Sequence, residues 1–403
     1  MLVQTIVIRT LLAATVFACA SFVDAQEVES QSEFWASRDV VIKAKSNASV
    51  VRIGIWDSGV DVSLFPGQIA LGKDRKALLR GYNSFKLRED TAMEVLPSTF
   101  ANRRDELNRA LKASDDMADL VASQALREFN ERRGKMTVEE RRELDAAVGR
   151  WSGYVHGTVV ADIAVKGNTQ AQIVIARMEW WHGSPPVPCW NQELANREAE
   201  SIRDLLSFLV KSGARVVNMS WGRFEASYLG NLRQCAPEMT LEDRQKLARY
   251  TVEKIRGVLQ EGMKAAPNVL FVGASGNSGT SVAAANPATR FSLPNFILVG
   301  AVDRLGKATQ FTNKGPEVTL YANGERVPSR LPGGEISYPS GTSMATPNVT
   351  NAAAKMLIVN PRLTGAEMRA LLEQTGDKNS TGQLLLHTAR AVEAARPSAK
   401  PIR

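Results

Sequence analysis

The stretch best suited to covalent chemistry is Ser-Gly-Thr-Ser-Met-Ala-Thr-Pro at residues 340–347, in which Ser343 follows two small residues and precedes an apolar-periodic run. This layout predicts a serine in the first turn of a buried helix, beside a backbone N–H and the positive end of the helix dipole. A serine placed there could attack a carbonyl carbon. The same pattern also fits an ordinary Ser/Thr helix cap, so the rest of the chain has to distinguish the two.

A serine hydroxyl needs an imidazole to take its proton, and the imidazole needs a carboxylate to fix its tautomer. The chain contains three histidines. His182 falls in a stretch rich in tryptophan and proline that is typical of a loop, and His387 has the surroundings of a half-buried helix or turn residue. His156 stands at the start of a helix expected over residues 156–165, which would hold its ring above the edge of a sheet.

The carboxylate candidate is Asp57. It follows an apolar run at residues 50–56, which predicts a position at the carboxyl end of the first strand. The Asp-Ser-Gly turn that it opens is common in proteins and indicates little alone.

Together the three stretches resemble the motifs of the subtilisin-like serine proteases, whose triad residues follow one another in the order Asp, His, Ser. Asp57 matches the Asp-Ser/Thr-Gly motif, His156 the His-Gly-Thr motif, and Ser343 the Gly-Thr-Ser-Met-Ala motif. The order excludes a chymotrypsin-like or α/β-hydrolase triad. The resemblance covers residues 50–81 and, with interruptions, 151–395, and it implies that Asp57 orients His156 and that His156 deprotonates Ser343.

A fourth match lies between the histidine and serine motifs. Gly-Ala-Ser-Gly-Asn at residues 273–277 follows an expected strand and resembles the family's oxyanion segment. The resemblance implies that the Asn277 side-chain amide and the Ser343 N–H bind the oxyanion of a tetrahedral intermediate. A turn residue in the left-handed conformation is the alternative for Asn277.

The resemblance also implies where substrate binds. Ser-Trp-Gly at residues 220–222 looks like the edge strand that pairs with extended substrate, so binding would add a strand to the sheet. Trp221 replaces the aliphatic residue usual in the family, and shallow or aromatic pockets would follow. The implied substrate-binding residues are Ser220, Trp221, Gly222, Ala274, Ser275 and Gly276.

Two residues depart from the family's pattern near the motifs. Asn348 replaces a histidine that often follows the family's proline, at a position that is usually structural. Asp162 replaces a small residue in the helix after His156, and its carboxylate would perturb His156 if it pointed inward.

Five short runs rich in β-branched residues are typical of strands buried on both faces. Helical periodicity separates most of them, and this alternation predicts an α/β fold with a doubly wound, mainly parallel sheet flanked by helices. The expected strands are 50–56, 173–176, 216–219, 269–272 and 296–299, and the expected helices are 156–165, 198–211, 241–264, 343–359 and 365–374.

Residues 86–150 interrupt this pattern, since 27 of these 65 residues are charged, 13 basic and 14 acidic. Apolar residues recur there at spacings of three, four or seven, and Thr-Val-Glu-Glu at residues 137–140 has the form of a capping box. We therefore expect an inserted helical segment on the surface of the main fold. It could be a solvated face with no function of its own, a lid, or a docking site for a partner.

The N-terminus has the features of a secretory signal. Arg9 precedes an apolar run at residues 11–23, and small residues precede a cleavage position after residue 25. Lipid attachment at Cys19 is the competing interpretation, although the residues before it make a poor lipobox. We expect export to the periplasm or the extracellular space and, because no later run reaches 18 apolar residues, no membrane span.

Removal of the signal leaves Cys189 and Cys235, which an oxidising compartment could join; two unrelated thiols are the alternative. They fall in two expected surface loops, residues 180–200 and 222–240, which a disulfide would tie together near the cleft. The formal net charge is +8, but Lys and Arg are scattered, which argues against nucleic-acid binding. The chemistry requires no cofactor. Calcium, common in the family, has no ligand cluster of the required spacing and is left open.

These observations predict an exported serine endopeptidase that cleaves polypeptides through an acyl-enzyme on Ser343. One alternative is a peptide ligase or cyclase, which would pass the acyl group to an amine, and another is a catalytically silent binding module with the protease fold. The expected organisation is a signal peptide (1–25), a lead-in arm (26–49), a protease domain (50–395) carrying the helical insertion (86–150), and a flexible tail (396–403).

Overall fold

The computed structural model describes residues 32–42, 50–178, 188–285 and 291–397. Within these ranges the largest sheet has nine strands, in the order β10-β11-β7-β6-β5-β4-β1-β3-β2. Neighbouring strands are parallel except for β10 and β11. The strands of this sheet are β1 (Val51–Asp57), β2 (Leu79–Gly81), β3 (Ala171–Arg177), β4 (Val216–Met219), β5 (Leu270–Ala274), β6 (Phe296–Val302), β7 (Leu320–Asn323), β10 (Asp377–Lys378) and β11 (Leu384–Leu385), and a separate pair is formed by β8 (Ser329–Arg330) and β9 (Ile336–Ser337).

The core strands direct successive side chains to opposite apolar layers, as the pleat of a strand requires. In β1, Val51, Ile53 and Ile55 belong to one layer, whereas Trp56 belongs to the other. Because both layers are buried, such strands are almost continuous apolar runs in the sequence. The five expected strands are all present, as β1, β3, β4, β5 and β6.

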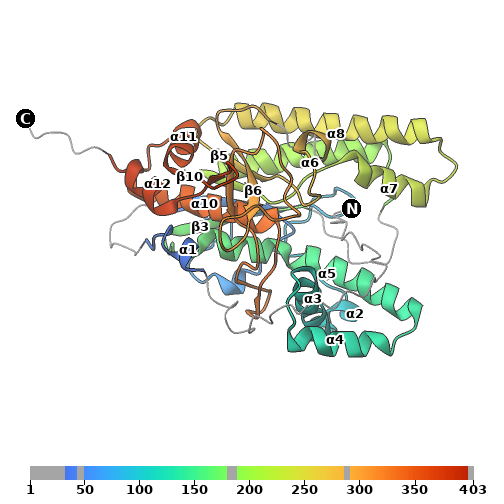
Figure 1. Cartoon of the computed structure of the whole chain (residues 1–403). Coiled ribbons are helices and arrows are strands. Elements are labelled where there is room, and N and C mark those ends of the chain that lie inside the picture. The colour runs from blue at the N-terminus through green and yellow to red at the C-terminus, as the bar shows by residue number, and fades with distance from the viewer. Residues whose placement is uncertain (1–31, 43–49, 179–187, 286–290, 398–403) are drawn as a thin grey trace, which may run out of the picture.

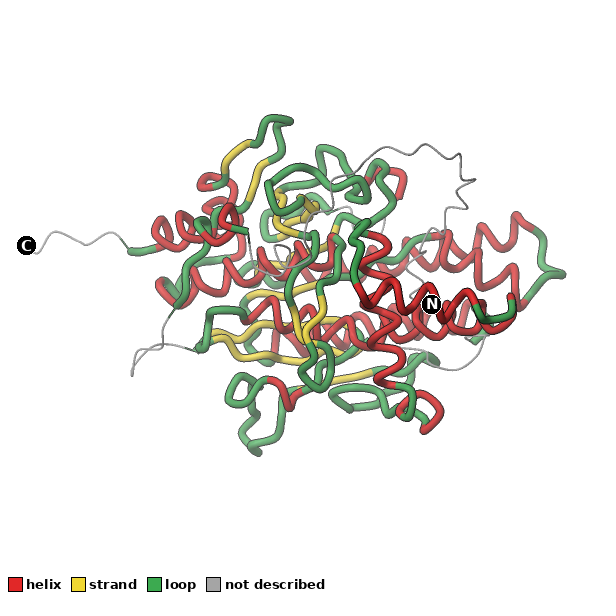
Figure 2. Tube along the Cα trace, turned by 60° about the horizontal axis from the view of Figure 1, so that its bottom comes forward, coloured by secondary structure: helices red, strands yellow, loops and turns green. Residues whose placement is uncertain are grey.

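Helices cover both faces of the sheet, with the strands running side by side between them (Figures 1 and 2). Helices α5, α10, α11 and α12 pack on one apolar layer, and α6, α7 and α8 pack on the other. The predicted doubly wound α/β fold is therefore confirmed. The helices are α1 (Glu33–Ala36), the 3₁₀ helix η2 (Val62–Leu64), α2 (Ser98–Ala101), α3 (Arg104–Ala118), α4 (Gln124–Gly134), α5 (Val138–Val165), α6 (Gln192–Lys211), α7 (Glu225–Cys235), α8 (Leu241–Lys264), α9 (Val282–Ala285), α10 (Thr342–Val359), α11 (Gly365–Thr375) and α12 (Thr388–Ala395).

The order of the strands reverses at β1, which lies between β3 and β4. Such a reversal opens a crevice at the carboxyl ends of the strands, where α/β folds place their sites. Asp57 ends β1, Ser220 follows β4, and residues 275–277 follow β5. The candidate residues on these three strands therefore lie at one edge of the sheet.

The charged segment before His156 is helical. In Figure 1, α2, α3 and α4 lie together beneath α5, at one side of the molecule. They share an apolar cluster with α5, to which Leu107, Phe129 and Trp151 contribute. The capping box at Thr137 is confirmed, since its side chain and that of the glutamate three residues later bond each other's backbone N–H groups.

The prediction that a helix begins at His156 was wrong. Helix α5 begins at Val138 and continues without a break to Val165, so His156 lies in its second half. The helix starts at the capping box of Thr137. Buried residues at helical spacing, among them Leu144 and Trp151, continue its apolar face as far as the histidine. The charged segment and the histidine motif thus share one helix.

The structure also differs from the sequence predictions at the two expected loops and at the N-terminal arm. Residues 222–240, expected as a loop, contain α7, and α6 begins at Gln192 inside the other expected loop. Residues 32–42, expected as part of an extended arm, include α1, whose Trp35 is buried in the core. The predicted signal peptide and Cys19 lie outside the described residues. None of the helices that the structure describes combines the length and apolarity needed to cross a bilayer.

Candidate active site

Asp57 and His156 are brought together where α5 packs on the end of β1. His156 Nδ1 lies 2.8 Å from Asp57 Oδ1, and Asp57 is only 4% exposed. The same carboxylate oxygen accepts the N–H of Ser58 at 2.8 Å. Gly157 permits the close approach, because a Cβ at that position would lie 2.2 Å from the main-chain oxygen of Gly59. The glycine of the histidine motif is therefore required for the helix to reach the strand.

The surroundings of His156 suit a general base. Burial lowers the pKa of the imidazole, but the charge of Asp57 and the hydrogen bond to it outweigh burial, so the pKa is raised above its usual value. Nε2 is buried and has no hydrogen-bond partner among the described residues. A proton on Nδ1, donated to Asp57, leaves the lone pair on Nε2.

Ser343 lies in the first turn of α10, as expected, and is 5% exposed. The N-cap of α10 is Gly341, so the alternative role of Ser343 as a helix cap is wrong. The Thr342 N–H donates to Asn277 Oδ1 at 2.9 Å, and the Met344 N–H donates to the Gly341 carbonyl oxygen at 3.0 Å. Among the described residues, the Ser343 N–H has no such acceptor, as is common for an N–H in the first turn of a helix.

Ser343 and His156 lie on helices that pack against each other. Met344, next to Ser343, shares an apolar cluster with Val155, next to His156. The Ser343 hydroxyl donates to the Ser220 carbonyl oxygen at 3.1 Å, and within the described chain no hydrogen bond joins it to His156 Nε2. In serine hydrolases this bond is often long without substrate and tightens in the complex.

Asn277 is anchored at the start of α10 through its side-chain oxygen. Oδ1 accepts hydrogen bonds from the N–H of Thr342 at 2.9 Å and from its hydroxyl at 2.8 Å. A Cβ at position 341 would lie 3.4 Å from Asn277 Nδ2 and 3.7 Å from Ser343 N, so the two nitrogens border one small space beside Gly341. Hydrogen-bond donors placed in this way can stabilise an oxyanion. Asn277 is not among the residues with positive φ, so the left-handed turn alternative is wrong.

Asn313, which belongs to none of the sequence motifs, fixes the loop that carries Asn277. It is 1% exposed, and its Oδ1 accepts the N–H groups of Ser278 and Thr280 at 3.0 and 3.2 Å. Its Nδ2 donates to the Ser275 carbonyl oxygen at 2.9 Å. A single asparagine in a polar stretch has no periodicity, so nothing in the sequence marks it.

The segment expected to pair with substrate follows β4. Residues 220–222 form no strand in the structure, so the implied edge strand is not formed, and pairing with substrate stays a prediction. Trp221 is 4% exposed, and its ring makes a T-shaped contact with Trp56 at 5.0 Å between centroids. The ring belongs to the apolar layer beneath the site, and a role of Trp221 in shaping a binding pocket stays a prediction.

The other predicted substrate-binding residues lie at the end of β5. Ala274 and Ser275 are buried, and Gly276 is half-buried beside Asn277. The hydroxyl of Ser275 donates to the main-chain oxygen of Asn313 at 3.3 Å, which gives it a structural role. Contact of these residues with substrate stays a prediction.

Cys189 and Cys235 form a disulfide in the structure, with Cα atoms 5.5 Å apart. Cys235 is the last residue of α7, and Cys189 lies three residues before α6 begins at Gln192. The bond therefore joins the entrance of α6 to the end of α7 on the same face of the sheet.

The two residues that depart from the family's pattern near the motifs, Asp162 and Asn348, both make structural hydrogen bonds. The carboxylate of Asp162 accepts the main-chain N–H of Arg330 at 3.0 Å and its Nε–H at 2.7 Å, so it points toward β8 and not toward His156. Asn348 donates to the carbonyl oxygens of Asn323 and Met344, each at 3.0 Å. His387 is half-buried as expected, and His182 lies outside the described residues.

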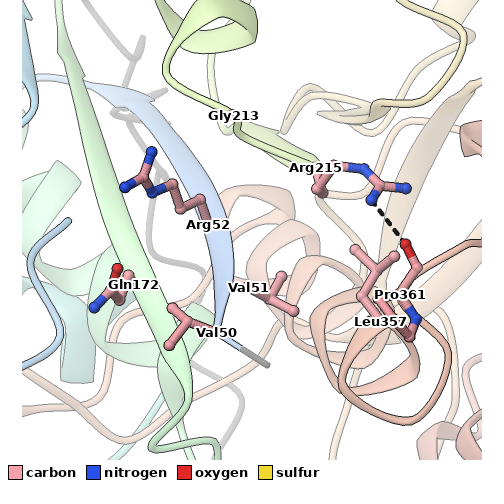
Figure 3. Close-up of a pocket in the computed structure, with 8 residues that line it drawn as sticks. All are labelled: Val50, Val51, Arg52, Gln172, Gly213, Arg215, Leu357 and Pro361. Atoms are coloured by element: carbon pink, nitrogen blue, oxygen red, sulfur yellow. Dashed lines mark hydrogen bonds between the residues drawn. The ribbon is translucent and has the colours of Figure 1, made fainter. Parts of the chain in front are cut away.

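A pocket of about 320 Å³ lies at the opposite, amino-terminal edge of the sheet (Figure 3). Its two guanidinium groups donate to main-chain oxygens near helix ends, Arg52 to Ser212 at 2.8 Å and Arg215 to Pro361 at 2.9 Å. These contacts give both cations a structural role. The described residues include no group of three or more His, Cys, Asp or Glu side chains placed to hold a metal ion.

Two curated proteins are similar to part of this chain. A subtilisin of Bacillus pumilus is 37% identical over 107 residues, which are 27% of this chain and 39% of the relative. A cell wall-associated protease of Bacillus subtilis (strain 168) is 36% identical over 110 residues, 27% of this chain and 12% of the relative. The chain thus matches well under half the length of these curated relatives.

Two solved structures have the same fold. The A-subunit of the AB5 toxin from E. coli is 17% identical, with a TM-score of 0.50 over 87% of this chain and 93% of its own. A lanthipeptide protease is 13% identical, with a TM-score of 0.50 over 85% of this chain and 87% of its own. The sequence profile of the subtilase family matches residues 48–390. The chain belongs to the subtilase family.

Proposed function

We propose that this chain is a serine endopeptidase that hydrolyses polypeptides through an acyl-enzyme on Ser343. The observation that carries the proposal is the Asp57–His156 pair, with 2.8 Å between Oδ1 and Nδ1 and a buried Nε2 that no described group engages. Membership of the subtilase family supports the same activity.

The proposed first step is attack by Ser343 Oγ on the carbonyl carbon of the scissile peptide. His156 Nε2 takes the hydroxyl proton as the carbon–oxygen bond forms, and Asp57 stabilises the imidazolium without taking its proton. The proton then passes from Nε2 to the leaving amine, and the C–N bond breaks. Water repeats the sequence on the ester, with His156 as base and then as acid.

Charge on the carbonyl oxygen would be stabilised beside Gly341. The Asn277 Nδ2 and the Ser343 N–H border this space, and the two hydrogen bonds from Thr342 to Asn277 Oδ1 hold the amide in place. A preorganised donor of this kind is typically worth about 3–4 kcal/mol of barrier.

We also infer export to the periplasm or the extracellular space. The apolar run near the N-terminus and the Cys189–Cys235 disulfide support it, because such bonds persist in oxidising compartments. Intact mass of the purified protein with and without reduction tests the disulfide, since alkylation of two thiols without reductant would contradict it.

The activity is tested with a fluorophosphonate probe and unfolded casein, using the full chain and its Ser343→Ala variant. We expect Ser343-dependent labelling and casein cleavage that are both lost in the variant. A protein that is not labelled at Ser343 would contradict the proposal. Labelling without casein cleavage would favour acyl transfer or a narrow specificity.

A further inference from the structure

The end of α3 contacts the segment that leads into Ser343. Asp119, which follows α3, accepts a hydrogen bond at Oδ2 from Ser340 Oγ at 2.8 Å. The same hydroxyl oxygen accepts the main-chain N–H of Arg326 at 2.8 Å. Ser340 precedes Ser343 by three residues. A side chain of the charged helical segment is therefore bonded to the stretch of chain that leads into the proposed nucleophile.

A buried ion pair reinforces this contact. Arg326 Nη1 lies 2.8 Å from Asp116 Oδ1 and 3.6 Å from Asp119 Oδ2, and the three side chains are 14%, 12% and 10% exposed. Arg326 has a φ of 46°, a left-handed conformation that costs a residue with a Cβ free energy and persists only where its surroundings impose it. The two aspartates from the helical segment supply that restraint.

The residue on the other side of Ser343 packs into an apolar cluster to which the same segment contributes. Met344 is 4% exposed and lies in the apolar cluster that includes Leu107 and Trp151. The nucleophile is therefore flanked by a polar contact with the charged segment at Ser340 and, at Met344, by an apolar cluster that includes residues of that segment. Helix α5, which carries His156, continues from the same segment.

We propose that Asp119 is a positioning residue for the nucleophile. Its hydrogen bond to Ser340 sets the path of residues 340–343, and this path decides where Ser343 Oγ and the Ser343 N–H point. The inference rests on the proposed function of Ser343. Asp119 touches no reacting group and acts through Ser340, so its loss should slow acylation more than it weakens substrate binding.

The test compares four variants of the full chain: Asp119→Ala, Asp119→Asn, Ser340→Ala and, as a matched control, Asp105→Ala, which removes an exposed carboxylate from the same helix. We expect Asp119→Ala and Ser340→Ala to slow fluorophosphonate labelling of Ser343 and to lower kcat for a chromogenic peptide about 10- to 100-fold, as small misplacements of a nucleophile do. KM should stay within about threefold. Asp119→Asn should recover most of the rate because its amide oxygen still accepts a hydrogen bond.

The double variant Asp119→Ala/Ser340→Ala separates positioning from general weakening of the fold. It should be labelled no more slowly than Ser340→Ala, because that variant already lacks both the hydrogen bond to Asp119 and the acceptor of the Arg326 N–H. If Asp119→Ala fails to fold, the labelling rate of Ser340→Ala tests the proposal instead. This variant keeps Asp119 beside Arg326, so the ion pair is not disturbed. Normal labelling of Ser340→Ala, or a loss in kcat that Asp119→Asn does not recover, would overturn the positioning role while leaving the proposed function intact. A wild-type protein that is not labelled at all would overturn both.

Discussion

Ser220 and Ser343 exchange hydrogen bonds: the hydroxyl of each donates to the main-chain carbonyl oxygen of the other, at 2.9 Å from Ser220 and 3.1 Å from Ser343. The carbonyl oxygen of Ser343 is open to this bond because its helical partner would be the N–H of residue 347, which is a proline. Pro347 thus leaves the Ser343 carbonyl oxygen free to accept the hydroxyl of Ser220, which directly follows β4.

Replacement of Ser220 by alanine removes the donor that satisfies the buried Ser343 carbonyl oxygen. We expect the free energy of unfolding to fall by about 1–3 kcal/mol, the cost of a buried polar group left unpaired. Urea denaturation measures it. Ser37→Ala, which removes an exposed hydroxyl that also donates to a main-chain carbonyl, is the control and should change stability by much less. Equal losses in the two variants would contradict the role of Ser220.

The pH dependence of kcat/KM follows from the Asp57–His156 pair. Since the pKa of His156 is raised above 6.5 and the base must be neutral, activity should rise with pH and reach half its plateau above 6.5. In Asp57→Asn the negative charge that raises the pKa is lost and burial remains, so the midpoint should move to lower pH. The plateau should fall about 10⁴-fold. A midpoint that does not move in Asp57→Asn would exclude this assignment.

Asn277→Ala removes one of the two proposed oxyanion donors. We expect kcat to fall about 10²- to 10³-fold with little change in KM, because the donor acts on charge that develops only in the transition state. Thr342→Val is the control, since it removes one of the bonds to Asn277 Oδ1 but leaves the amide in the site. Steady-state kinetics with one peptide substrate compares them. A larger loss in Thr342→Val than in Asn277→Ala would contradict the donor role.

Lys355 of α10 is fully buried and pairs with Asp39 at 2.8 Å, which fastens residues 32–42 to the helix of the nucleophile. Asp39→Ala should lower the free energy of unfolding by about 2 kcal/mol, less than for a fully buried pair because Asp39 is 33% exposed. The pKa of Lys355 is already lowered by burial. A lysine with a depressed folded-state pKa destabilises the fold most at low pH, so the loss should shrink as the pH approaches 10.5.

The control for this prediction is the double variant Asp39→Ala/Lys355→Met. Methionine has a similar length and no charge, so it should restore much of the stability lost in Asp39→Ala at pH 7. Chemical denaturation at pH 7 and pH 9.5 compares the three proteins. A loss in Asp39→Ala that is equal at both pH values, or that methionine does not reduce, would show that the ion pair is not its cause.

The parts of the fold that were predictable are those with strong local patterns. The buried core strands are almost unbroken apolar runs, and Asp57, His156 and Ser343 lie in short motifs whose order is specific. The shortest strands were missed because two residues, as in β10 and β11, are too few to show a period. The helix start at His156 was wrongly placed because the charged face of residues 138–150 masks the apolar positions that continue the same helix.

The contacts that hold the site were not predictable, because they join residues far apart in the chain. Asn313 acts through three hydrogen bonds to the loop after β5 and Asp119 through one to Ser340, and no spacing rule connects them to Asn277 or Ser343. The burial of Trp221 depends on Trp56 from another strand. A lid or docking role for residues 86–150, and the expected division into domains, stay predictions.

The unbroken course of α5 has a consequence for engineering the chain. Deletion of residues 86–150 would remove the cap at Thr137 and the first half of the helix that carries His156, so the remaining helix would begin without the bonds that start it. Residues 86–150 therefore cannot be removed without disrupting the helix that carries His156. A shortened enzyme would need a new helix start before Trp151 and new partners for Met344 and Ser340.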